Sequence, residues 1–384
     1  MRRVYFDHSA TTPVDPAVVE AMLPFLNEKF GNPSSIHSFG REAKVALEEA
    51  REIVADFCRV RAADIYFTSG GTESDNMAIK GVAYELKNKG RHIITSKVEH
   101  HAVLHTCEFL EKEGFEVSYV APDSYGMIHP EAVAEAIRKD TILISIMHAN
   151  NEVGTINPIE QIGALAKERG ILFHTDAVQT FGKIPIDLSK LPVDLMSMSG
   201  HKIYGPKGIG VLYVRKGVKL VPLSHGGGHE RNRRPGTENV PGIIGLAKAV
   251  ELRRDRMQSD NEYVGRLRDK FHELINKSIP RVILNGHPEK RLAGHLNLSF
   301  QGIEGEALLL SLDLKGVAAS SGSACTSGSI DPSHVLTAMG IKPEISRSSI
   351  RFTLGRDNSE EDVEYAASIL PEIVQRLRSM SALE

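Results

Sequence analysis

Apolar strand patterns and amphipathic helix patterns alternate along the first two thirds of the chain. Each helix–strand pair has apolar residues at helical spacing and then a short apolar run. The pairs lie at 48–57 and 64–69, 73–90 and 91–96, 101–114 and 116–120, 130–140 and 141–149, and 158–170 and 171–177, and two further strands lie at 193–200 and 208–214. Such alternation requires crossover connections, so it predicts a mostly parallel sheet with helices on both faces.

The pattern changes near Glu251. A long charged helix is predicted at 251–279, and shorter mixed elements follow, including strands at 295–300 and 348–355. We therefore predict an α/β protein with a large domain built on the mostly parallel sheet and a second, smaller α+β domain.

Composition narrows the possible partners and the compartment. Of 384 residues, 41% are hydrophobic and 25% are charged, which is ordinary for a globular protein. The 46 basic and 49 acidic residues give a net charge of −3, so we expect no nucleic-acid or membrane-surface partner. No apolar run approaches the ~18 residues of a membrane span, and the N-terminus lacks the apolar core of a signal peptide. Three cysteines spaced far apart form no disulfide framework, which predicts a cytoplasmic protein.

The three cysteines differ in their surroundings. Cys58 and Cys107 share helical faces with apolar residues, so we expect both to act as small buried hydrophobes. Cys325 lies in "SSGSACTSGS" (320–329), where the other nine residues are Ser, Gly, Ala or Thr. Its local sequence supports an incidental loop thiol as well as it supports a reactive one.

Four polar segments follow predicted strands, at 68–76, 147–154, 174–180 and 196–210. In an open parallel sheet, ligands bind beyond the carboxyl ends of the strands. Thr72 stands at a glycine-rich helix start, which suits a phosphate or a plain helix cap in which Asp75 has capping-box spacing. Asp176 ends a buried strand and needs a partner, which could be a backbone N–H, an arginine or a protonated ligand nitrogen.

Lys202 follows an apolar strand in a tight turn after Ser199, Gly200 and His201. A lysine rarely occupies such a place unless it is paired or chemically used, and its amine can form a Schiff base with an aldehyde. Lys207 lies between glycines, and we expect it to be exposed to solvent. Those glycines precede a strand and do not open a helix, which argues against a nucleotide loop. An aspartate, a lysine and a phosphate-type helix start together suggest pyridoxal 5'-phosphate.

Nine segments then carry a family resemblance. The chain resembles the cysteine desulfurases of the nitrogen-fixation and iron–sulfur-cluster-assembly type, within the class V aminotransferase-like group. The segments run in the family's order from residue 5 to residue 356: "YFDHSATTP", "GNPSSIHSFG", "TSGGTESDN", "HANNEVG", "HTDAVQT", "SGHKIYGPKGIG", "GGGHERNRRPGTEN", "SSGSACTSGS" and "SSIRFTLGR". The resemblance implies the fold-type I transferase fold of pyridoxal-phosphate enzymes. We expect a large cofactor-binding domain over 16–257 and a small domain over 1–15 and 258–384 that carries the cysteine segment.

The resemblance also implies roles for the cofactor-binding residues. Lys202 would hold the cofactor, Asp176 would pair with its ring nitrogen, and Gln179 would bond its phenolic oxygen. His100 would stack on the ring and act as acid or base. The phosphate would be held by Gly71, Thr72, Ser199 and His201, joined by Thr237 from the partner subunit of a homodimer.

Asn151 and Arg351 would bind the carboxylate region of the substrate, L-cysteine. The planar fork of an arginine suits a carboxylate, although Arg351 taken alone could equally be a solvent-facing strand residue. His101 and His105 are four residues apart on a predicted helix, but no third ligand completes a site, so we expect no metal.

Cys325 would take the substrate sulfur as a persulfide, release L-alanine and deliver the sulfur to an iron–sulfur scaffold or another acceptor protein. Its Gly and Ser neighbours predict a loop suited to such delivery, and the segment from Ala318 to His334 resembles the family's extended-loop branch. Two alternatives remain at this point. One is a related enzyme on the same scaffold, a selenocysteine lyase or an aminotransferase, and the other is a cofactor-free sulfur-relay or scaffold protein.

Overall fold

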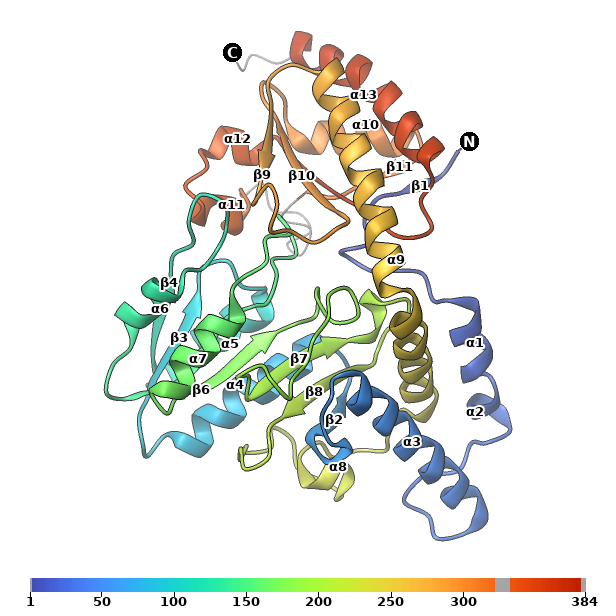
Figure 1. The fold of residues 1–384 in the computed structure, drawn as a ribbon, viewed down its shortest axis with the longest axis vertical. Helices are drawn as coiled ribbons and strands as arrows, with labels where there is room; N and C mark the ends of the chain where they lie inside the picture. The colour runs from blue at the N-terminus through green and yellow to red at the C-terminus, as the bar shows by residue number, and fades with distance from the viewer. Residues whose placement is uncertain (1, 322–331, 381–384) are drawn as a thin grey trace.

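The computed structural model describes residues 2–321 and 332–380, and its centre is a seven-stranded sheet (Figure 1). The strand order is β2-β8-β7-β6-β5-β3-β4. In these residues β3 pairs in parallel with β4 and β5, and β6 pairs in parallel with β5 and β7, whereas β8 is antiparallel to β2 and β7. The strands are β2 (Ile65–Thr68), β3 (His92–Ser96), β4 (Glu116–Val120), β5 (Thr141–Ser145), β6 (Leu172–Asp176), β7 (Leu195–Ser199) and β8 (Gly210–Val214). The mostly parallel sheet predicted from the sequence is confirmed.

Helices cover both faces of this sheet. Alternate strand residues enter different apolar clusters: Ile93 and Leu195 pack with helices α4 and α5, whereas Ile94 and Met196 pack on the opposite face. The described helices include none that is long and apolar enough to cross a membrane. They are α1 (Pro16–Met22), α2 (Pro24–Asn27), α3 (Ser38–Phe57), α4 (Gly71–Leu86), α5 (His101–Lys112), α6 (Pro130–Ala136), α7 (Ile159–Glu168), α8 (His229–Asn232) and α9 (Val240–Ser278), with short 3₁₀ turns η1 (Ala62–Asp64) and η2 (Gly200–Lys202).

A second, smaller sheet forms the other core. Strands β9 (Val282–Asn285), β10 (His295–Phe300) and β12 (Ser349–Thr353) pair antiparallel in the order β12-β10-β9. Phe6, Phe271 and Phe352 meet in its apolar cluster, which confirms the smaller α+β part. Strand β1 (Val4–Tyr5) pairs in parallel with β11 (Val317–Ala318) in a separate two-stranded sheet, and Val4 and Val317 belong to the same apolar cluster. The remaining helices are α10 (Gly305–Leu314), α11 (His334–Ala338), α12 (Pro343–Arg347) and α13 (Glu360–Met380).

Helix α9 connects the two cores and begins earlier than the sequence predicted. It starts at Val240, where the Asn239 side chain accepts a hydrogen bond from the backbone N–H of Gly242, and not near Glu251. Its first turns are buried on most sides, so they lack the alternation of apolar and polar residues that marks a surface helix. A Cβ atom at Gly245 would lie 2.6 Å from Met22 Sδ, so any larger residue there would require the Met22 side chain of α1 to shift. The helix runs without a break through residue 257, and the domain boundaries stay a prediction.

Cys58 and Cys107 are both fully buried, as predicted. Cys58 belongs to the apolar cluster on one face of the large sheet, and Cys107 belongs to the cluster on the other face. Burial raises the pKa of the Cys58 thiol to about 12 and raises the pKa of Cys107 as well. A thiol with a raised pKa stays protonated at neutral pH and is a poor nucleophile, so both cysteines serve packing.

Candidate active site

A cavity of about 270 Å³ opens at the carboxyl ends of β5, β6 and β7. Because parallel strands end at the same edge of a sheet, segments far apart in the sequence meet here. The cavity is lined by these predicted site residues: Gly71, Thr72, His100, Asn151, Asp176, Gln179, Ser199, His201, Lys202 and Arg351. The structure thus brings together all of the predicted site residues except Thr237, which lies outside this cavity, and Cys325, which lies outside the described residues.

Lys202 ends the 3₁₀ turn η2, directly after β7. Its Nζ atom donates hydrogen bonds to the backbone carbonyl oxygens of Ser9 and Ala10, both at 2.7 Å. The N-terminal segment is held against this turn because the backbone N–H of Thr12 donates to the carbonyl oxygen of His201 at 2.9 Å. The amine is therefore directed into the cavity at a defined place. Lys207 is exposed, as predicted, and does not line the cavity.

Asp176 is the last residue of β6 and is 6% exposed. Its Oδ1 atom accepts a hydrogen bond from the backbone N–H of Val178 at 2.8 Å. Burial raises the pKa of Asp176 to about 6, although the Val178 hydrogen bond and the charge of Lys202 act in the opposite direction. A carboxyl in this position is ionised most readily when a cation lies beside it.

Helix α4 does not begin with the capping box that the spacing of Thr72 and Asp75 suggested. The N-cap is Gly70, whose φ of +155° is a conformation that side chains disfavour. Asp75 points instead into the interior, where burial and the neighbouring Asp176 raise its pKa well above the usual value. The first residues of α4, Gly71 and Thr72, line the cavity, so the helix N-terminus faces it. Such a terminus attracts an anion.

His100 is the N-cap of α5. Its Nδ1 atom accepts a hydrogen bond from the backbone N–H of Ala102 at 3.0 Å, which assigns the ring proton to Nε2. Burial and the positive charge of Lys202 lower the pKa of His100 to about 4. Burial and Lys202 also lower the pKa of His201 to about 4. Both imidazoles are therefore neutral at neutral pH, and the His100 ring carries its proton on Nε2 because Nδ1 is occupied by the helix cap.

The Gln179 amide is held from two sides. Its Nε2 atom donates to the carbonyl oxygen of Ser9 at 3.0 Å, and its Oε1 atom accepts from Lys183 Nζ at 3.2 Å. The sequence analysis identified neither Ser9 nor Lys183. The sequence feature that could have identified Lys183 is its position four residues after Gln179. The turns between the two residues bring their side chains together.

Arg351 lies on β12 and is 3% exposed, so it is not a solvent-facing strand residue. It donates to Asp7 Oδ1 at 2.8 Å and to the backbone carbonyl oxygen of Asn151 at 3.2 Å. Its Nε atom is buried and has no hydrogen-bond partner among the described residues. Asp7 was not predicted as a site residue. It lies just after β1, in an irregular segment without a helical or strand periodicity.

Thr237 is exposed in the loop that follows α8. Three consecutive residues of α8, Glu230, Arg231 and Asn232, have positive φ angles of 44°, 55° and 65°. Non-glycine residues occupy such conformations only when surrounding contacts enforce them. Contacts from other segments must therefore hold α8 in this shape.

A buried ion pair anchors this loop. The carboxylate of Glu230 accepts two hydrogen bonds from the Arg51 guanidinium, at 2.7 and 2.8 Å, and one from the backbone N–H of Phe67 at 2.8 Å. The side chains of Arg51 and Glu230 are only 3% and 2% exposed. Since Phe67 belongs to β2, the ion pair ties the strained loop to the edge of the large sheet.

The described residues on either side of 322–331 attach beside the cavity. Ser320 exchanges backbone hydrogen bonds with Arg351, at 3.1 and 2.7 Å. On the other side, Ser333 Oγ donates to Glu152 Oε2 at 2.6 Å, and His334 Nε2 lies 3.0 Å from the carbonyl oxygen of Glu99. The chain is therefore held beside residues of the cavity wall at Ser320 and again close to it at Ser333 and His334.

The paired histidines of α5 were considered as metal ligands. The rings of His101 and His105 stack with their centroids 4.9 Å apart. Within residues 2–321 and 332–380, no group of three or more His, Cys, Asp or Glu side chains is arranged to hold a metal ion.

Comparison with known proteins adds to this geometry. The sequence model of the aminotransferase class-V family matches residues 4–366. A cysteine desulfurase IscS from Methanosarcina thermophila is 58% identical over 382 residues, which cover 100% of this chain and 94% of that protein. Another from Dictyoglomus turgidum is 56% identical over 380 residues, covering 99% of this chain and 96% of that protein. The chain belongs to the cysteine desulfurases of the aminotransferase class-V family. The family resemblance predicted from the sequence motifs is confirmed.

Solved structures of this family share the fold. A NifS-like protein superimposes with a TM-score of 0.92 at 42% identity, over 98% of this chain and 100% of that chain. The structure of SspA in complex with cysteine has a TM-score of 0.82 at 42% identity, over 93% of this chain and 100% of that chain. The predicted α/β fold of this family is confirmed.

The ion pair of Arg51 and Glu230 generates a stability prediction. Glu230→Ala leaves the Arg51 guanidinium buried without its main partner, so we expect the free energy of unfolding to fall by about 3–5 kcal/mol. The matched control is Glu48→Ala, since Glu48 also pairs with Arg51 but is 40% exposed. Its loss should cost less than about 1 kcal/mol. Denaturant unfolding measures both, and equal losses would contradict the prediction.

Proposed function

We propose that the protein is an L-cysteine desulfurase that depends on pyridoxal 5'-phosphate and forms L-alanine and a persulfide on Cys325. The observation that carries this proposal is the convergence of three groups on one cavity. They are the amine of Lys202, the carboxylate of Asp176 and the N-terminus of α4. An amine, an acid and an anion site in one cavity match the aldehyde, the ring nitrogen and the phosphate of this cofactor.

The residues around the cavity fit the cofactor chemically. When bound, the cofactor supplies an aldehyde that takes up an amine and a ring that draws electrons from the substrate's α-carbon. Lys202 would hold it, and Asp176 would pair with its protonated ring nitrogen, since a nearby cation offsets the burial that raises the pKa of this carboxyl. The phosphate would be held by Gly71, Thr72, Ser199 and His201.

The substrate's carboxylate has a matching site. Arg351 carries a buried Nε atom without a partner among the described residues, and its guanidinium faces the cavity beside Asn151. A carboxylate bound there would share Arg351 with Asp7, and the planar guanidinium has donors for both. We assign substrate-carboxylate binding to Arg351 and Asn151.

Proton transfer and sulfur transfer are assigned to His100 and Cys325. His100 is neutral, its Nδ1 atom is occupied by the helix-cap hydrogen bond and its Nε2 atom carries the ring proton, so it can donate that proton near Lys202. Cys325, as a thiolate, would attack the sulfur of the substrate. A sulfur–sulfur bond forms, the substrate's carbon–sulfur bond breaks, and its electron pair stays with the fragment that becomes alanine. The persulfide would then pass its outer sulfur to an iron–sulfur scaffold or another acceptor protein.

We further propose a homodimer. An apolar surface on the N-terminal helices is exposed in the single chain: Leu23 (53%), Leu26 (61%), Phe30 (66%), Ile36 (92%) and Phe39 (52%). Exposed apolar surface of this extent is typical of an interface. A groove beside it is lined by Pro33, Ser34 and Glu238, and Glu238 is the neighbour of Thr237. Thr237 would thus lie at the interface and could reach the partner subunit's phosphate site.

The compartment follows from the cysteines. Cys58 and Cys107 are free thiols in separate apolar clusters. Because proteins of oxidising compartments tend to use their cysteines in disulfides, we propose that this protein works in the cytoplasm.

The first test of the proposed function concerns the amine. Borohydride reduction of the protein loaded with pyridoxal phosphate should label Lys202 and preserve the covalent link for peptide mapping. Lys202→Ala should lose the label and the yellow colour almost completely, because Lys202 lines the cavity and the nearby Lys207 does not. Lys207→Ala, the matched control, should keep both. A label on Lys207 would refute the assignment.

The second test concerns the sulfur acceptor. Cys325→Ala should bind the cofactor, and the absorption of the bound cofactor should still change when L-cysteine is added. The reason is that Cys325 is not among the residues assigned to bind the cofactor or L-cysteine. Alanine formation should fall by roughly 10³-fold, as expected when a nucleophile is removed. Mass spectrometry of the wild-type protein after brief exposure to L-cysteine should find one added sulfur on the peptide that contains Cys325.

The two buried cysteines are the matched controls for this test. Cys58→Ala and Cys107→Ala should retain turnover while losing about 1–3 kcal/mol of stability from packing. A persulfide on either of these residues, or normal turnover by Cys325→Ala, would refute the mechanism.

The third test concerns the dimer. The double substitution Leu26→Glu with Ile36→Glu places two charges on the proposed interface, so sedimentation should show dissociation at least about tenfold easier than for the wild type. Bound cofactor should decrease in parallel if Thr237 completes the partner's phosphate site. Leu314→Glu is the control, since Leu314 is 74% exposed but lies on α10, outside the proposed interface. A wild-type monomer saturated with cofactor would contradict the proposal.

A further inference from the structure

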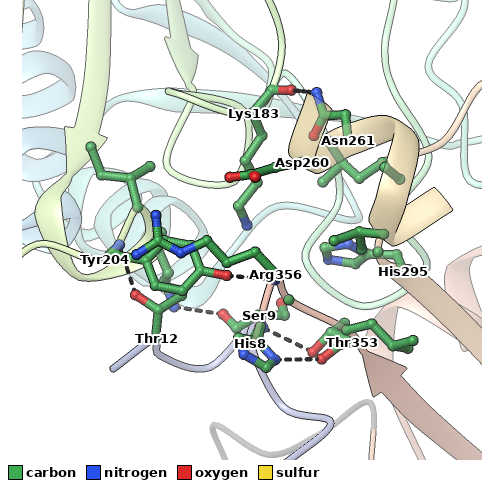
Figure 2. Close-up of a pocket in the computed structure, with 18 of the residues that line it drawn as sticks. His8, Ser9, Thr12, Lys183, Tyr204, Asp260, Asn261, His295, Thr353 and Arg356 are labelled. Carbon is green, nitrogen blue, oxygen red and sulfur yellow. Dashed lines mark hydrogen bonds between the residues drawn. The ribbon is translucent and has the colours of Figure 1, made fainter. Parts of the chain in front are cut away.

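Lys183 lies outside the cavity that holds the predicted site residues, yet it contacts one of them. It lines an adjacent cavity of about 60 Å³, which shares Lys202 and Ser9 with the first cavity. Figure 2 shows the Lys183 side chain extending into this second cavity from the side that also carries Asp260 and Asn261. Its Nζ atom donates to Gln179 Oε1 at 3.2 Å, so the hydrogen bond connects the two cavities.

This hydrogen bond decides which way the Gln179 amide faces. An ammonium group has donors and no acceptor, so the amide atom opposite Lys183 must be the oxygen. The other amide atom lies 3.0 Å from the carbonyl oxygen of Ser9, which only accepts, so that atom must be the nitrogen. Lys202 Nζ donates to the same Ser9 oxygen at 2.7 Å. The Nε2 donor of Gln179 and the amine of Lys202 therefore converge on one point at the edge of the cavity.

The surroundings of Lys183 make its charge sensitive to pH. Burial, and then the positive charges of Lys202, Arg253 and Arg351, lower the pKa of Lys183 to about 7. A depressed lysine pKa means that the ammonium is present below that pH and is lost as the pH rises through it. A neutral amine can also accept a hydrogen bond, and then it no longer dictates the orientation of the amide.

Several other titratable or charged side chains line the same cavity. They come from the N-terminal segment, from α9, from β10 and from the residues after β12: His8, Asp260, His295 and Arg356, besides Lys202 and Arg253. Asp260 is paired with Arg253, and Arg356 is paired with Asp15. Lys183 thus faces a mainly positive cavity. Its hydrogen bond to Gln179 connects Lys183 to the proposed cofactor site.

We propose that Lys183 is a positioning residue that acts through Gln179: its ammonium holds the amide so that Nε2 donates to the phenolic oxygen of the cofactor. This inference rests on the proposed function, because it requires pyridoxal phosphate beside Lys202. A hydrogen-bond chain polarises its members, so Lys183 also strengthens the donor of Gln179. A stronger donor stabilises the deprotonated form of the bound chromophore and lowers the pH at which its absorption changes.

The test uses absorption spectra of the loaded protein, without substrate, across a range of pH. K183M should retain the cofactor but shift the midpoint of the absorption change upward by about one pH unit, the size expected for losing one such contact. K183A removes the same ammonium with a different side-chain volume and should shift the midpoint in the same direction. K183R keeps a charged donor and should stay near the wild-type midpoint. K207M, which removes an exposed lysine, should leave the midpoint unchanged.

A double-mutant cycle separates action through Gln179 from an independent effect. Q179L removes the amide, so adding K183M to Q179L should shift the midpoint no further. Additive shifts, or a wild-type midpoint in both K183M and K183A, would overturn the inference while the proposed function stands. If the wild-type protein took up no pyridoxal phosphate, the proposed function would fail and the inference with it.

Discussion

The hydrogen bonds of the N-terminal segment Asp7–Thr12 tie the two cores of the molecule to one site. Toward the large sheet, Ser9 accepts from Lys202 and Gln179, and the Thr12 N–H donates to His201. Toward the small sheet, the backbone N–H of Ser9 donates to the hydroxyl of Thr353 on β12, and Asp7 accepts from Arg351. A segment without regular structure can satisfy so many neighbours because its own backbone groups are not used in a helix or a sheet. The site depends on this segment, since it fixes the amine and the arginine relative to each other.

Burial then controls which groups in the site carry charge. It raises the pKa of Asp176 and lowers the pKa of His100, His201 and Lys183, so each group tends toward its neutral form. Positive charge from Lys202 adds to the effect on the three bases and opposes it at Asp176. The result is a site in which an acid favours a cationic neighbour while the imidazole of His100 stays neutral. These properties are the ones that the proposed cofactor and substrate would require of the site.

The surface features point to assembly. Pro33, Ser34 and Glu238 line one groove and are close in sequence to the exposed Phe30, Ile36 and Thr237, and the Arg51–Glu230 pair holds α8 against β2. Burying such a pair has a desolvation cost that three hydrogen bonds to the Glu230 carboxylate offset. A strained turn that is held so firmly has a fixed outline, which fits the proposed contact of this region with a second copy of the chain. The proposed homodimer would also account for the position of Thr237 outside the cavity of its own chain.

Local pattern alone determined the alternating strands and helices, because the side-chain periods of a half-buried helix and a buried strand are properties of short segments. It also placed Asp176, Ser199 and Lys202 at strand ends, and the ordered motifs assigned the family. Other features were decided by contacts between distant segments. The start of α9 at Val240 could not be recognised in the sequence because burial on most sides removes the amphipathic pattern. Asp75 points into the interior and does not form a capping box, because Gly70 is the N-cap of α4. The pairing of Arg351 with Asp7 and the hydrogen bond from Lys183 to Gln179 also escaped the sequence. Each depends on where a side chain points after the chain has folded, and no periodicity records that direction.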